Sequence, residues 1–165
     1  IAMPSSLTSI GYYAFRNCTS LAGITLPSQL KTLGDYAFQN CSSLASIDLP
    51  SSLKSIGSDA FRACTSLTSI ALPSSLTSIS SNTFASCTSL SSVTLPEGLQ
   101  TIESNAFFET ALAHVTLPST ITTISSQAFA NCLRMRSYTV NEGCTTINGS
   151  TSPWYGCENI KVLYL

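Results

Sequence analysis

The sequence has little charge of either sign and no long apolar run. Charged residues make up 9% of its 165 residues, against roughly 25% in an average soluble protein. Lys and Arg form no cluster, so the electrostatic footprint of a nucleic-acid-binding protein is missing. No apolar run approaches the roughly 18–20 residues of a membrane-spanning helix, so we expect no membrane insertion by this segment.

Side chains that could support catalysis are equally scarce. The abundant serines would need a base and an orienting acid to act as nucleophiles, and His114 is the only histidine. The eight carboxylates do not share one repeat phase, and neither an acid–base pair nor a calcium-binding loop emerges. Since a Gly-rich phosphate-binding motif is also missing, the sequence predicts a protein that is not an enzyme and needs no cofactor or metal.

What the sequence has in abundance is hydroxyl side chains and a strict repeat. It contains 30 Ser and 20 Thr, yet its apolar residues recur at fixed intervals, unlike those of a disordered polar chain. Proline, phenylalanine and cysteine recur in one phase every 23 residues, except for one repeat of 22 residues. The residues in this phase are Pro4, Pro27, Pro50, Pro73, Pro96, Pro118; Phe15, Phe38, Phe61, Phe84, Phe107, Phe129; Cys18, Cys41, Cys64, Cys87. The unit reads I-x-L-P-S-S-L-x-S-I-x-x-x-A-F-x-x-C-x-S-L-x-S.

A unit of this size has too few apolar groups to bury a core alone, so neighbouring units must stack. The I-x-L stretch alternates as a strand does, with Ile47 and Leu49 inward and Asp48 outward, and the following proline ends it. A second extended piece carries Leu53 and Ile56 inward, and we expect a helical turn around the Ala-Phe pair. The sequence predicts a right-handed leucine-rich-repeat solenoid of the α/β type, rich in β-structure with short helical turns, with about seven 23-residue repeats.

Two irregularities interrupt the array. One residue is lost between Phe107 and Leu112, and the cysteine position disappears with it. In the last unit Asn141 replaces proline, Cys144 replaces a core leucine and Trp154 replaces phenylalanine after a two-residue insertion.

The chain also begins and ends within a repeat. We therefore interpret residues 1–165 as a single solenoid domain that is a fragment of a longer protein. Raw ends of a solenoid expose core columns and strand edges, so we expect either end-to-end self-association or covering by further chain.

The repeat closely resembles the BspA-like, or Treponema pallidum-type, leucine-rich repeats. The LPSSLxSI, AFxxC and CxSLxSI segments carry the resemblance, as in residues 60–70, and it covers the whole chain. Similar proteins are typically secreted or surface-anchored, occur in host-associated bacteria and some protozoan parasites, and are often proposed to act in adhesion or host interaction. The resemblance thus implies an extracellular or cell-surface protein whose partner is a host or extracellular protein or glycan.

The repeating cysteines allow three interpretations. A disulfide framework conflicts with the odd count of seven and with a column in which every side chain points the same way. A zinc site needs four ligands that converge on a point, whereas a column with this period spreads along a line. We favour a buried column of free thiols that help to satisfy the backbone groups of the turns. Its members are Cys18, Cys41, Cys64, Cys87, Cys132 and Cys157.

A partner would contact one of the long regular faces of the solenoid. The first-strand face projects small, nearly uncharged side chains, except towards the C-terminal units, where arginine and aromatic residues gather. Since binding hot spots favour Tyr, Trp and Arg, the possible ligand face comprises Thr94, His114, Thr116, Arg134, Arg136 and Tyr164. Trp154 and Tyr155 either join this hot spot or are irregular residues near the end of the array, with Trp154 in the core.

Two functions remain open at this stage. The first is a non-catalytic interaction module for adhesion or host-ligand binding. The alternative is a structural spacer that presents another domain, which the uniform Ser/Thr faces of the middle units favour. The fold itself does not decide between them, because function lies in sites grafted on the fold.

Overall fold

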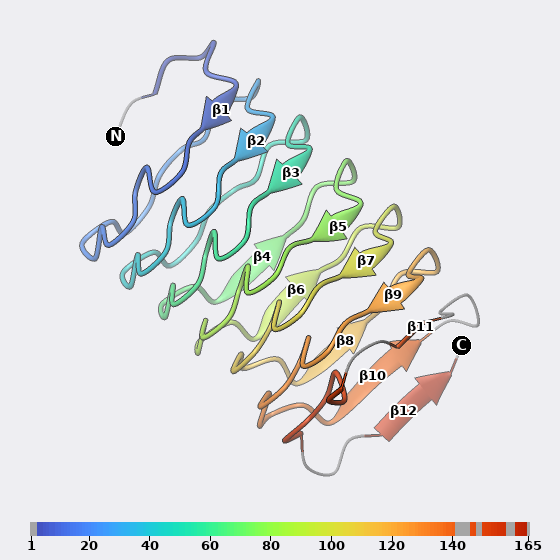
Figure 1. Cartoon of the computed structure of the whole chain (residues 1–165). Helices are drawn as coiled ribbons and strands as arrows, with labels where there is room; N and C mark the ends of the chain where they lie inside the picture. Colours follow the sequence, from blue (N-terminus) through green and yellow to red (C-terminus); the bar gives the residue numbers. More distant parts are fainter. Residues whose placement is uncertain (1–2, 141–145, 148–149, 158–160, 165) are drawn as a thin grey trace.

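The chain winds into a stack of similar coils, which we call rungs. A computed structural model describes residues 3–140, 146–147, 150–157 and 161–164, and places β1 and β12 at opposite ends of the stack (Figure 1). Two rows of short strands follow the stack. The first row contains β1 (Ser9–Ile10), β2 (Thr32–Leu33), β3 (Ser55–Ile56), β5 (Ser78–Ile79), β7 (Thr101–Ile102), β9 (Thr123–Ile124) and β11 (Thr146–Ile147). The second row contains β4 (Ser69–Ala71), β6 (Ser92–Thr94), β8 (His114–Thr116), β10 (Ser137–Val140) and β12 (Lys161–Tyr164).

Every strand pairing is parallel and links equivalent positions of successive rungs. Within the first row the order is β1-β2-β3 and β5-β7-β9-β11, and within the second it is β4-β6 and β8-β10-β12. Ser9 pairs with Thr32 and Ile10 with Leu33, which is a shift of one 23-residue repeat. The predicted solenoid fold and its repeat spacing are therefore confirmed.

Proline follows three strands of the second row, β4, β6 and β8, and starts the next turn. Pro73 lies two residues after β4, and its carbonyl accepts the N–H of Leu76 at 3.1 Å. The leucine that ends the turn is buried in successive rungs, as Leu53 and Leu76 are. The inward positions of the first row are buried as predicted from β1 to β9, Ile56 among them.

The segment around the Ala-Phe pair is not helical, which corrects one expectation. The described part of the chain contains no α-helix, and therefore no helix that could cross a bilayer. Tyr36 and Asn40 have φ angles of 58° and 59°, in the left-handed region, while the residues between them do not. A helix would direct each N–H to a carbonyl of its own segment, and this alternation prevents that.

The alternating backbone instead divides its hydrogen bonds between two rungs. The N–H groups of Tyr36, Phe38 and Asn40 reach carbonyls of the next rung at 2.7–2.9 Å. The N–H groups of Gln39 and Cys41 bond within their own rung at 3.1 Å. Because buried backbone groups need partners, the turn segments form a third column of hydrogen bonds along the stack.

Phenylalanines stack through the centre of the core. Neighbouring rings from Phe15 to Phe129 are 5.1–5.5 Å apart between centroids and tilted by 2–12°. Trp154 continues the column, 5.8 Å from Phe129. Leucine and isoleucine columns surround these rings and fill the space between the strand rows and the turn segments.

Candidate binding surface

The cysteines form a hydrogen-bonded column beside the phenylalanines. From Cys41 onward, each described thiol donates to the carbonyl of a phenylalanine in the preceding rung, as Cys64 does to Phe38 at 3.2 Å and Cys87 to Phe61 at 3.1 Å. The same carbonyl accepts the N–H of the cysteine in its own rung. All six described cysteines are free thiols, and four are buried, while Cys18 is exposed and Cys157 is partly buried.

Thr110 occupies the cysteine position of the shortened rung, where the sequence pattern suggests a gap. Its hydroxyl lies 3.1 Å from the carbonyl oxygen of Phe107 and 3.2 Å from the Sγ of Cys132. The thiols reach a carbonyl of the preceding rung, whereas this hydroxyl donates to the carbonyl of its own rung and contacts the column at Cys132. The spacing in the sequence could have identified this position, because Thr110 follows Phe107 by three residues, as each cysteine follows its phenylalanine.

Burial keeps the thiols of Cys41, Cys64 and Cys87 neutral. It raises the pKa of Cys41 to about 11 and the pKa of Cys87 to about 12. It also raises the pKa of Cys64 well above the usual range. A neutral thiol is a poor nucleophile, so this column suits a structural role.

Many surface hydroxyls are engaged within the stack. The hydroxyl of Thr65 donates to the carbonyl of Ser42 at 3.4 Å, and that of Ser91 donates to the carbonyl of Thr68 at 3.3 Å. These bonds join neighbouring rungs. A face of such side chains offers few distinctive features to a selective partner.

Three residues of the predicted ligand face line one groove. Thr94, His114 and Thr116 share a groove of about 490 Å³ on β6 and β8. The Nδ1 of His114 lies 2.8 Å from the hydroxyl of Ser137, and its Nε2 lies 3.2 Å from that of Thr116. Both described contacts of this ring are with hydroxyls, whereas a catalytic base of the triad type is oriented by a carboxylate.

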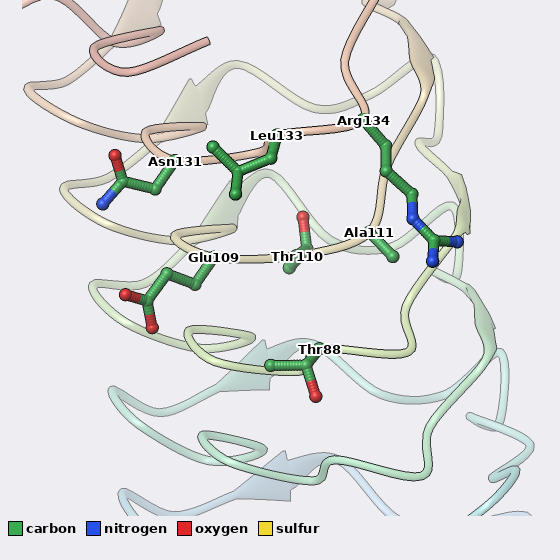
Figure 2. A pocket seen from close by; sticks show the side chains of 7 residues that line it. All are labelled: Thr88, Glu109, Thr110, Ala111, Asn131, Leu133 and Arg134. Carbon is green, nitrogen blue, oxygen red and sulfur yellow. The ribbon is translucent and has the colours of Figure 1, made fainter.

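Arg134 lines a second groove, which we call the notch (Figure 2). The notch has a volume of about 550 Å³ and is built from three successive rungs. Its lining residues are Thr88, Glu109, Thr110, Ala111, Asn131, Leu133 and Arg134.

The notch results from the lost residue. A full rung places two residues between the cysteine and the next leucine, such as Thr88 and Ser89, which are both exposed. The shortened rung has only Ala111 there, and Ala111 is 6% exposed. The surface is therefore recessed between the rungs on either side.

Arg136, another residue of the predicted face, does not join these grooves. Arg136 is exposed and donates to the carbonyl of Leu133 at 3.4 Å, but it does not line the notch. The side chain of Tyr164 lies outside the described residues, as does Cys144.

Trp154 belongs to the core, which decides between the two interpretations of this residue. It is 8% exposed and stacks on Tyr138 with the ring centroids 4.0 Å apart. Its neighbour Tyr155 is 59% exposed.

The first two rungs carry an aromatic cluster that the repeat pattern does not reveal. The rings of Tyr12, Tyr13 and Tyr36 contact one another with centroid distances of 4.0–5.5 Å. The guanidinium of Arg16 lies 4.8 Å from the centre of the Tyr13 ring, and its Nε donates to Gln39 at 2.6 Å. Tyr13 and Tyr36 share one left-handed position of the turn segment, so the repeat brings them together.

The described side chains form several distinct contact surfaces. Within the described ranges, no group of three His, Cys, Asp or Glu side chains is placed to hold a metal ion. The only salt bridge found in that part of the chain joins Arg62 and Asp59 at 3.2 Å. The distinctive surface chemistry lies in the notch, the strand-face groove and the tyrosine cluster.

Comparison with known proteins agrees with this architecture. A family model of the BspA-type leucine-rich repeat region, with six copies, matches residues 1–87 and 56–165. No curated protein is similar enough to the sequence to count as a match.

Several solved structures share the fold. A leucine-rich repeat protein from Bacteroides ovatus is 28% identical with a TM-score of 0.79, over 98% of this chain and 48% of that one. The Treponema pallidum leucine-rich repeat protein is 33% identical with a TM-score of 0.80, over 88% of this chain and 71% of that one. A leucine-rich cell surface protein from Faecalibacterium prausnitzii has the same fold at 24% identity and a TM-score of 0.69, over 98% and 59% of the two chains. The chain thus spans about half the length of the Bacteroides protein.

Proposed function

Because the chain belongs to the BspA-type leucine-rich repeat family, we propose that it is a non-catalytic binding module of a secreted or cell-surface protein. Its partner is a host or extracellular protein, and its role is adhesion. The extracellular location follows from the resemblance, since proteins with such repeats are typically secreted or surface-anchored.

The observation that carries the binding role is the pair of grooves at the shortened rung. On the shortened rung the lining of the notch ends at Ala111, and the lining of the strand-face groove starts two residues later, at Ala113. Around the shortened rung the surface is recessed and Leu133 and Arg134 replace the hydroxyl pair of the full rungs, so shape and chemistry change together. Arginine is a typical anchor of binding interfaces, and Arg134 lies in the notch beside the exposed side chain of Leu133.

One observation favours the alternative of a structural spacer. Hydroxyls of the N-terminal half, such as those of Ser42 and Thr65, donate to carbonyls of the preceding rung. Side chains used in this way stiffen the stack and leave few free hydrogen-bonding groups for selective recognition of a partner. In that case the solenoid holds another domain away from the surface.

Binding of the chain to a panel of immobilised extracellular-matrix proteins and glycans tests the proposal. Two double variants accompany the wild type: Thr94→Arg with Thr116→Arg, and Arg134→Ala with Arg136→Ala. We expect a protein of the panel to bind and one double variant to lose that binding, which locates the face used. Binding by a longer parent protein but not by this chain would replace the binding role with the spacer role. Protease treatment of intact source cells tests the location, because a surface protein is digested while the cells stay closed.

A further inference from the structure

Several departures from the repeat coincide at the notch. In four full rungs the cysteine is followed by two hydroxyl residues, Thr-Ser or Ser-Ser. In the shortened rung Ala111 stands alone, and in the next rung Leu133 and Arg134 replace the hydroxyl pair. Natural sequences break their local rules mainly at functional or strained sites, so the coincidence marks this part of the surface.

Glu109 is a further departure in the same place. It has a φ of 57°, in the left-handed region. Asparagine, which tolerates this region better than most residues, holds the equivalent position in three other rungs: Asn17, Asn40 and Asn131. Local stability therefore does not explain a glutamate at the rim of the notch.

The notch has opposite charges on its two sides and an apolar middle. Figure 2 shows Glu109 and Arg134 on opposite sides, with Leu133 and Ala111 between them. The side chain of Leu133 is 70% exposed, in a face otherwise made of hydroxyls. Glu109 and Arg134 do not pair with each other, since the one salt bridge among the described residues lies elsewhere. Glu109 accepts a hydrogen bond from Ser86 at 3.1 Å, and a carboxylate can accept several more.

We propose that the notch binds a short extended segment of the partner protein. The segment places an acidic side chain at Arg134, an apolar side chain on Leu133 and Ala111, and a basic side chain at Glu109. This inference deepens the proposed binding function and rests on it.

The chemistry of the lining favours a peptide over a sugar. An arginine fork matches a carboxylate with two parallel hydrogen bonds, and the apolar middle suits an aliphatic side chain. The volume of about 550 Å³ lies within the roughly 300–1,000 Å³ of small-ligand sites. None of the seven lining residues is aromatic, so a glycan would find no ring on which to stack.

Selection from a phage library of random seven-residue peptides tests the inference with the whole chain as target. We expect the selected peptides to share an acidic–apolar–basic order. Arg134→Glu should weaken their binding about tenfold or more, because it places like charges together. Lys54→Glu is the matched control, since it makes the same change of charge at an exposed position outside the notch and the strand-face groove, and should leave affinity unchanged. The double change Arg134→Glu with Glu109→Arg should select peptides of the reversed order.

A second variant removes the notch and not its charges. Inserting one serine between Ala111 and Leu112 restores the full repeat length and should abolish peptide binding. Circular dichroism shows whether this variant is folded, and Leu133→Ser replaces it if it is not.

Three results would overturn the inference. They are a library without enriched peptides, peptides that bind Arg134→Glu as well as the wild type, and a glycan that binds the notch in place of peptides. If a protein of the earlier panel binds and no notch variant weakens it, the inference fails and the proposed function stands. If neither the panel nor the library gives a ligand, both fail.

Discussion

Replacing Phe84 with alanine should destabilise the chain by about 4–5 kcal/mol, near the upper end for a buried phenylalanine. Phe84 is fully buried and lies 5.5 Å from Phe61 and 5.4 Å from Phe107 between ring centroids. Each ring pair contributes roughly 0.5–1.5 kcal/mol beyond the area it buries. The neighbouring rings are held by the hydrogen bonds of their own rungs, so they cannot move in to fill the hole. A folded domain is stable by only about 5–15 kcal/mol in total, so this variant is expected to be close to unfolding.

Urea unfolding followed by circular dichroism measures the loss. Phe84→Leu keeps most of the volume and removes both ring pairs, so it should cost about 1–3 kcal/mol. Thr68→Ala, at an exposed position, should stay within about 0.5 kcal/mol of the wild type. If Phe84→Ala and Phe84→Leu lose equal stability, or if the alanine variant loses less than about 2 kcal/mol, the packing argument is wrong.

Three further predictions concern the turn segments and the thiol column. Ala63 has a φ of 58°, so Ala63→Asn, which copies Asn40, should raise the free energy of unfolding by about 0.5–1 kcal/mol; a lower urea midpoint would contradict this. Glu109→Asn should likewise raise the urea midpoint, because asparagine tolerates the left-handed backbone better, while it weakens peptide binding to the notch. If stability and peptide affinity both rise or both fall, Glu109 does not trade stability for binding as proposed. Burial raises the pKa of Cys87 to about 12, above the roughly 8.5 of an unfolded thiol. The resulting stabilisation is present below the unfolded pKa and is lost as the pH rises towards the folded one. Unfolding free energy measured at rising pH should therefore fall above about pH 9, by up to about 1.4 kcal/mol per pH unit for this thiol, and Cys87→Ala should flatten that fall.

The stacking of the rungs could be predicted because each rung repeats the same inward residues. Leu53 and Ile56 are buried as the alternation indicates, and strand pairing follows the repeat register. The phenylalanine period likewise predicts a column, because equivalent residues of stacked units must meet.

The conformation of the turn segments could not be predicted in the same way. Left-handed backbone is usually signalled by glycine, but here Tyr36, Asp59, Ala63 and Glu109 all adopt it. The inter-rung hydrogen bonds of these segments hold the backbone, so the choice is made by the neighbouring rung and not by the local sequence. The Ala-Phe pair therefore resembles a helical turn when read alone.

The binding surface was only partly predictable, for a related reason. Thr94, His114 and Thr116 could be placed on one face because strand residues alternate. The notch depends on what a missing residue leaves exposed on the rungs before and after it. That is a property of three rungs together, and the 22-residue spacing alone predicts only a shortened coil.

The hydrogen bonds between rungs run in opposite directions in different columns. In the turn segments the N–H of Tyr13 points forward to the carbonyl of Asp35 in the next rung. Beside β2 the N–H of Gly34 points back to the carbonyl of Ile10 in the preceding rung. Peptide dipoles that all pointed one way would add up, as they do in an α-helix. Here the two columns oppose each other, so the same unit can be repeated many times without building up partial charge at either pole of the stack.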